Sequence, residues 1–151
     1  MSGLVLAVGL LLTGSCRSTP PLPPVDLSAP GWQVRQGQAV WRPTKSRPEV
    51  AGDLWVATRP GGDLFVQFAK EPFVLATAQV AGERWRIEFG AGRYSRRGIG
   101  QPPARFAWFE LGRVLAGEVP HNGWDFMRLT TNTWKLENRR TGESLEGYVW
   151  R

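Results

Sequence analysis

The amino-acid sequence predicts one mainly β domain with a single main helix, an α+β fold whose strands form an antiparallel meander. Two observations carry this prediction. Between Asp53 and Phe89, short runs in which successive side chains would point to opposite faces of a strand are separated by turn sequences. Only one later segment, between Pro102 and Gly117, places apolar residues at helical spacing.

The clearest strand signals come first in this region. We expect strands at residues 53–59, 64–69, 73–80 and 84–89. Pro60-Gly61-Gly62-Asp63 has the composition of a hairpin turn. In the fourth run, Trp85, Ile87 and Phe89 alternate with charged residues, as in a strand with one buried face. The first three runs carry apolar residues on both faces, so another part of the chain must cover the second face.

The rest of the domain is predicted to contain a loop, the helix and three more strands. Residues 90–100 are rich in glycine and arginine, which predicts a mobile surface loop; phosphate binding is the alternative, although no Gly-Lys-Ser/Thr element is present. Pro102-Pro103 suits a helix start and Gly117 its end. Further strands are expected at 124–129, 133–138 and 145–150, while residues 32–41 fit either a strand or a short helix.

The N-terminal residues have the pattern of an export signal. Residues 1–15 are uncharged and mostly apolar, and the run is too short to span a bilayer. Thr13-Gly14-Ser15-Cys16 resembles the bacterial lipobox, which predicts cleavage before Cys16 and lipidation of its thiol. Cys16 is the only cysteine, so no intrachain disulfide can form. An ordinary signal peptide with an incidental cysteine, or a short N-terminal core segment, is the alternative.

Three regions follow from these signals. Residues 1–15 are the expected signal peptide, residues 16–31 a lipidated cysteine with a proline-rich tether, and residues 32–151 the β-rich domain. The formal net charge of +6 lies outside the apolar leader and favours anionic partners at the envelope. Nucleic acid is not expected as a partner of an exported protein, and we expect a monomer.

An enzyme is not the first expectation. His121 is the only histidine, and its position between Pro120 and Asn122-Gly123 predicts a solvated loop residue. No nucleophile-elbow pattern is present, and the chain has too few histidines and cysteines for a zinc site. Carboxylate pairs keep a hydrolase as a third alternative, with Glu110 among several acids expected at the surface. We expect no catalytic residue, cofactor or metal.

The aromatic residues allow two interpretations. The chain holds eight tryptophans and seven phenylalanines, which fit either a core of large residues or a cavity between sheet and helix. The hypothesised lining of that cavity is Trp55, Phe65, Phe68, Trp85, Trp108, Leu111 and Leu115. A second hypothesis is a basic surface for anionic partners, formed by Arg93, Arg96 and Arg97.

Several stretches resemble the LolA/LolB lipoprotein-carrier superfamily, and LolB in particular. Three of them look like the family's opening strands: residues 52–57 (GDLWVA), 63–68 (DLFVQF) and 73–76 (FVLA). Residues 103–117, ending in Leu-Ala-Gly, look like its helix before the last strands. The resemblance implies a curved sheet forming an incomplete barrel, with the helix packed on the concave face. It also implies a hydrophobic cavity for the acyl chains of a lipoprotein.

The leading functional hypothesis is therefore an envelope lipoprotein that binds or transfers lipid or lipoprotein acyl chains. The alternative is a structural lipoprotein that touches cell wall or lipopolysaccharide through its basic surface. Arg17 follows Cys16 where Asp commonly retains a lipoprotein at the inner membrane. By that resemblance we expect an anchor in the outer membrane, facing the periplasm.

Overall fold

The computed structural model describes residues 20–150, so Cys16 and the predicted signal peptide lie outside the described residues. Within the described range the chain forms nine strands and one α-helix. The strands are β1 (Gln33–Arg42), β2 (Val50–Thr58), β3 (Leu64–Lys70), β4 (Phe73–Ala81), β5 (Arg84–Phe89), β6 (Tyr94–Ile99), β7 (Trp124–Arg128), β8 (Thr133–Asn138) and β9 (Ser144–Trp150). The helix α1 spans Ala107–Leu115.

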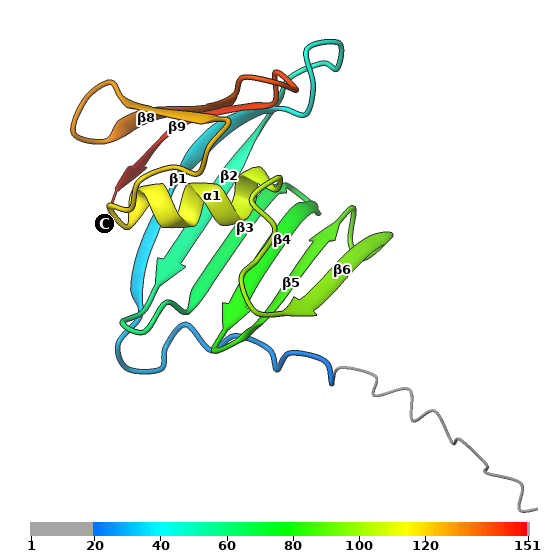
Figure 1. The fold of residues 1–151 in the computed structure, drawn as a ribbon, viewed down its shortest axis with the longest axis vertical. Helices are drawn as coiled ribbons and strands as arrows, with labels where there is room; N and C mark the ends of the chain where they lie inside the picture. The colour runs from blue at the N-terminus through cyan, green and yellow to red at the C-terminus, as the bar shows by residue number, and fades with distance from the viewer. Residues whose placement is uncertain (1–19, 151) are drawn as a thin grey trace, which may run out of the picture.

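All nine strands belong to one antiparallel sheet, in the order β6-β5-β4-β3-β2-β1-β9-β8-β7. Strands β1 to β6 each pair with their neighbours in sequence, and so do β7 to β9, while the pairing of β1 with β9 joins the two groups. The sheet stays open between β6 and β7, and α1 lies in the connection between these two edges (Figure 1). The predicted α+β fold, a curved antiparallel meander with one main helix on its concave face, is confirmed.

Glycines allow close backbone approach where β1 meets β9. A Cβ atom at Gly37 would overlap the carbonyl oxygen of Tyr148, and one at Gly147 would overlap that of Gln38. At these positions only glycine fits without a shift of the neighbouring strand. Beyond the pairing of β1 with β9, the strands β9, β8 and β7 turn over the end of α1 (Figure 1).

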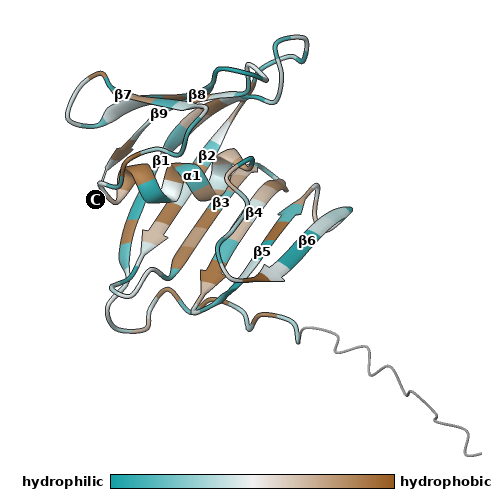
Figure 2. Cartoon of the chain, viewed as in Figure 1, coloured by the Kyte–Doolittle hydropathy of each residue, from teal (hydrophilic) through white to brown (hydrophobic). Residues whose placement is uncertain are grey.

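The core fills the space between α1 and the concave face. Leu54 and Val56 of β2, Val66 and Phe68 of β3, and Ile87 of β5 are buried there. From α1 the buried apolar side chains are Ala107, Trp108, Phe109, Leu111, Val114 and Leu115. Hydrophobic residues recur along the central strands, whereas β6 is mostly hydrophilic (Figure 2). The helix is short for independent stability, so its packing on the sheet must hold it.

Three local predictions need correction or resolution. The predicted loop at 90–100 is wrong, because residues 94–99 form β6 and pair with β5 along its whole length. The predicted helix start at Pro102-Pro103 is also wrong, since α1 begins at Ala107 after an extended Phe106. Residues 33–42 form a strand, which resolves the strand-or-helix ambiguity of the 32–41 stretch.

Part of the proline-rich segment lies against the sheet. Residues 20–31 contain no helix or strand, yet Leu22 is only 7% exposed. The Gln79 side-chain amide donates a hydrogen bond to the Pro23 carbonyl oxygen at 3.0 Å. Gln79 alternates with the core residues Ala78 and Ala76 and therefore points to the outer, convex face. The segment runs along the lower end of the sheet, where it reaches β1 (Figure 1).

Candidate functional site

The candidate site is a pocket beside α1, at the end of the sheet where three connections meet. It has a volume of about 740 Å³. Its walls come from the β2–β3 turn at 59–63, the β4–β5 turn at 82–83, the segment 100–104 and one side of α1. These segments are far apart in sequence and meet only in the folded chain.

The pocket has an apolar floor and a polar rim. Leu64, Val80 and Phe109 supply the floor, and Pro102, Pro103 and Ala104 line one wall. The rim carries acidic and basic side chains, from Arg59, Asp63, Glu83, Glu110, Arg113, Glu118 and His121. An apolar surface with a few convergent polar groups is the usual form of a small-molecule site.

A buried carboxylate organises one side of the rim. Glu110 is only 1% exposed, and its Oε1 accepts the backbone N–H of His121 at 2.6 Å. Its Oε2 lies 2.7 Å from His121 Nδ1 and 3.5 Å from Arg113 Nη1. These contacts satisfy a carboxylate that would otherwise be costly to bury, and they tie the 118–123 loop to α1.

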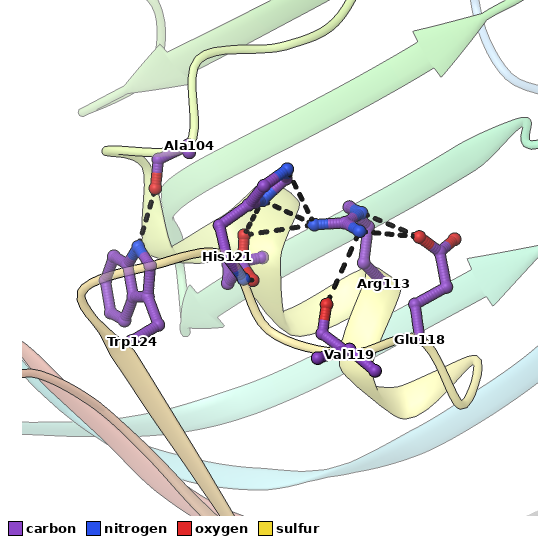
Figure 3. Close-up of polar contacts among 7 residues, drawn as sticks. Ala104, Arg113, Glu118, Val119, His121 and Trp124 are labelled. Carbon is purple, nitrogen blue, oxygen red and sulfur yellow. Dashed lines mark hydrogen bonds and ion pairs between the residues drawn. The ribbon is translucent and has the colours of Figure 1, made fainter.

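Arg113 continues this network toward solvent. Its guanidinium lies between His121 and Glu118 (Figure 3), and its Nη2 is 2.8 Å from Glu118 Oε2. Arg113 Nη1 is 3.1 Å from His121 Nε2. Nearby, the Trp124 indole N–H donates to the Ala104 carbonyl oxygen at 2.6 Å, which joins the start of β7 to the pocket wall.

A second set of contacts holds the two turns of the opposite wall together. Asp63 Oδ1 accepts the backbone N–H of Gly82 at 2.9 Å, and Asp63 Oδ2 accepts from Arg59 Nη2 at 2.6 Å. The Gly82 N–H, helped by Arg59, holds the pKa of Asp63 below its ordinary value. Asp63 is therefore a fixed anion that joins the β2–β3 turn to the β4–β5 turn.

The contacts of His121 differ from those of the histidine in a catalytic triad. A carboxylate on Nδ1 of a histidine also occurs in catalytic triads, where the other nitrogen meets a hydroxyl or thiol. Here Arg113 Nη1 contacts both ring nitrogens, Nδ1 and Nε2, and within residues 20–150 no hydroxyl is hydrogen-bonded to the ring. Groups of His, Cys, Asp and Glu suited to a metal ion are also not found in the described part of the chain.

One of the two expectations for this region is wrong. Glu110 was expected at the surface, but it is buried on the same side of α1 as Ala107, Leu111 and Val114. Glu110 follows Ala107 by three residues and precedes Val114 by four, and this helical spacing is the signal that could have placed it inside. His121 lies in a loop, as expected, with its side chain 37% exposed, and its ring also contacts Glu110 and Arg113.

The structure divides the seven residues hypothesised as a cavity lining between two faces. Phe68, Trp108, Leu111 and Leu115 are buried in the core, and Trp85 packs against it. The rings of Phe68 and Trp108 stack with centroids 5.1 Å apart, so they fill the layer between α1 and the sheet. Trp55 and Phe65 are half-buried and alternate with the core residues Val56 and Val66, which puts them on the outer face.

The three arginines hypothesised as an anionic-partner surface also lie apart. Arg93 is in the β5–β6 turn. Arg96 pairs in register with the core residue Ile87 and therefore lies on the concave side, with Arg96 Nε 2.9 Å from the Tyr94 hydroxyl. Arg97 pairs with Arg86 and lies on the outer face.

No family model matches the sequence, and no curated protein sequence matches it. Among the described residues, no helix has the length and apolar character needed to cross a membrane. The functional argument therefore depends on the pocket and the surfaces around it.

Proposed function

We propose that this chain is a lipid-anchored protein of the bacterial envelope that binds an acyl chain of a lipid or lipoprotein. The carrying observation is the pocket of about 740 Å³ beside α1, whose apolar floor lies below a charged rim. That volume is within the range of ligand sites, and the arrangement suits an amphipathic molecule. The apolar chain would contact Leu64, Val80 and Phe109, and its polar end would meet the rim.

The fold supports the same proposal. An open, curved antiparallel sheet with a helix on its concave face is the architecture that the resemblance to LolA and LolB implies. Phe109 connects the pocket to the aromatic layer, because its ring meets the Trp85 ring edge-on at 5.9 Å between centroids. A ligand longer than the pocket would enter this layer by displacing the Phe109 ring. Membership of that superfamily and an outer-membrane location are parts of the proposal.

Titration with a fluorescent fatty acid tests the binding site. The soluble Cys16→Ser chain should bind the probe saturably, and Ala104→Trp, which fills the pocket wall, should weaken binding at least about tenfold. Ala51→Trp is the matched control, because Ala51 is exposed on β2 and does not line this pocket. Absence of saturable binding, or equal weakening by both tryptophans, would overturn the proposed ligand site.

Metabolic labelling with a palmitate analogue tests the anchor separately. The unchanged chain should be labelled in cells, and Cys16→Ser should abolish the label while leaving the fold intact, because Cys16 precedes the described domain. Label that persists in the Cys16→Ser variant would remove the lipoprotein part of the proposal.

A further inference from the structure

Three arginines lie close together on the outer face of the sheet, near its β6 edge. Trp85 and Ile87 pack toward the core, so the alternating Arg84 and Arg86 point outward. Arg97 lies directly opposite Arg86 in the antiparallel register, and Ile99 lies opposite Arg84. We call these four residues, Arg84, Arg86, Arg97 and Ile99, the arginine face.

The charges of the arginine face are poorly compensated within the protein. Like charges directly opposite each other across two strands destabilise a sheet. Arg86 Nη1 lies 3.6 Å from Glu88 Oε1, but Arg84 and Arg97 form no ion pair with any residue in the described range. An anionic partner would relieve this repulsion, which gives the surface a reason to hold three arginines.

An exposed apolar residue indicates which anionic partner fits. Ile99 is 68% exposed although it stands in a strand beside these arginines. Basic residues around an exposed apolar side chain suit a phospholipid surface, where arginines meet phosphates and the apolar group enters the headgroup region. A soluble acidic polymer would give Ile99 no apolar environment.

The N-terminal segment brings the proposed anchor to this same face. The Gln79 amide nitrogen donates to the Pro23 carbonyl, and the Gln79 amide oxygen accepts from Arg86 Nη2 at 3.4 Å. Pro23 therefore lies one side chain away from Arg86. Cys16 is seven residues before Pro23, a distance of at most about 25 Å for an extended chain.

We propose that the arginine face docks on an anionic phospholipid membrane and that the segment 20–24 fixes the domain in this orientation. The N-terminal segment then acts as a short strap along the sheet, and the pocket beside α1 lies on the side of the sheet away from the bilayer. The orientation rests on the proposed lipidation of Cys16, whereas the affinity of the arginine face for lipid does not. The two parts are therefore separable by experiment.

Vesicle co-sedimentation of the unlipidated Cys16→Ser chain measures the arginine face alone. We expect binding to vesicles of phosphatidylglycerol and phosphatidylethanolamine, and none to phosphatidylcholine. Arg84→Gln with Arg97→Gln should weaken binding about 30-fold, since each arginine near an anionic surface contributes about fivefold. The control Arg47→Gln with Arg140→Gln removes the same charge from exposed positions in the β1–β2 and β8–β9 connections, and should change binding less than about threefold.

Several outcomes overturn the proposal. They are no binding to the anionic vesicles, equal weakening by both double variants, or arginine-dependent capture by polyglutamate without vesicle binding, which would assign the face to an acidic polymer. Urea unfolding midpoints that match the parent show that a weakened variant is still folded. Fatty-acid titration of the Arg84→Gln, Arg97→Gln variant should remain unchanged, so failure of the arginine face and failure of the ligand pocket give different results.

A label reports the orientation directly. The Cys16→Ser chain contains no cysteine, so a fluorophore can be placed at Ile99→Cys or, as the control, at Met127→Cys on exposed β7. Lipid-attached quenchers in anionic vesicles should quench the label at position 99 and leave the one at position 127 bright. Equal quenching at both positions, or quenching at 127 alone, would overturn the proposed orientation.

Discussion

At the scale of single residues, Glu143 is the carboxylate with the most strongly altered titration. It precedes β9 and accepts a hydrogen bond from the Trp41 indole N–H at 3.0 Å. Burial raises the pKa of Glu143 from 4.5 to about 7, although the Trp41 hydrogen bond acts in the opposite direction. The folded protein therefore keeps a proton at Glu143 over a pH range in which the unfolded chain has released it.

This difference predicts a pH-dependent stability. The contribution of Glu143 is fully present below about pH 4.5 and is lost as the pH rises through about 7, because the folded state then has to ionise a buried group. Glu143→Gln should raise the free energy of unfolding by up to about 3 kcal/mol at about pH 8 and leave it nearly unchanged at about pH 4. Urea unfolding at both pH values measures this, and an equal effect at the two would contradict it.

The contact between Glu110 and His121 gives a second residue-scale prediction. Glu110→Ala should lower the free energy of unfolding by about 1–2 kcal/mol, because it leaves the partly buried His121 N–H without its acceptor. His121→Ala should cost about 1–2 kcal/mol, since the backbone N–H remains and only the ring contact is lost. In a double-mutant cycle, the sum of the two single losses in unfolding free energy should exceed the loss of the double variant by about 1 kcal/mol. Additive losses would mean that the two side chains do not stabilise each other.

At the scale of elements, α1 approaches β3 so closely that one of its residues must lack a side chain. A Cβ atom at Gly112 would overlap both methyl groups of Leu64, so the helix backbone rests directly on that residue. This contact places one side of α1 along the pocket, where Phe109, Gly112 and Arg113 are lined up. Glycine normally weakens a helix interior, and here close packing explains its presence.

Gly112→Ala therefore has an effect opposite to the one expected from helix propensity. At an exposed helical position, replacing glycine with alanine stabilises by about 1 kcal/mol. Here we expect destabilisation by about 1–3 kcal/mol, because Leu64 must move. In a Leu64→Ala background the same change should become neutral or stabilising. Thermal or urea unfolding of the four proteins measures the sign, and the same sign in both backgrounds would refute the packing argument.

The elements also show which features the sequence could predict. Residues 84–89 were placed correctly because Trp85, Ile87 and Phe89 alternate with charged residues that lie on the outer face, a pattern typical of a strand with one apolar face. β6 was missed because an edge strand can be stabilised by backbone pairing alone, and its glycine and arginines carry no such alternation. The helix start was misplaced because Ala104 forms a hydrogen bond with a residue distant in sequence. Its carbonyl accepts from Trp124, which favours an extended wall over a first helical turn.

The candidate site was the hardest part to predict. Its walls come from connections whose meeting depends on the curvature of the whole sheet, and no local pattern encodes that curvature. The sequence located the aromatic residues that pack under α1, such as Phe68 and Trp108, but it could not separate them from Trp55 and Phe65. Strands β2 and β3 carry apolar residues on both faces, so the sequence does not show which face α1 covers.

At the scale of the whole molecule, apolar side chains on the outer face of the sheet also need to be covered. The concave face is covered by α1, while half-buried Trp55 and Phe65 lie on the convex face. Leu22 and Pro23 lie on this outer side, and the hydrogen bond from Gln79 fixes them there. The proline-rich segment thus forms part of the folded structure from Leu22 onward.

This role of the segment can be measured through Leu22. If residues 20–24 were only a flexible tether, Leu22→Ala would leave stability unchanged. Because Leu22 is buried, we expect the free energy of unfolding to fall by about 1–2 kcal/mol, at or below the low end for a core leucine because the site lies at the margin of the sheet. Val119→Ala is the control, since Val119 is 80% exposed and its truncation should change stability by less than about 0.5 kcal/mol. Equal, small effects of both substitutions would show that the segment detaches from the sheet in solution.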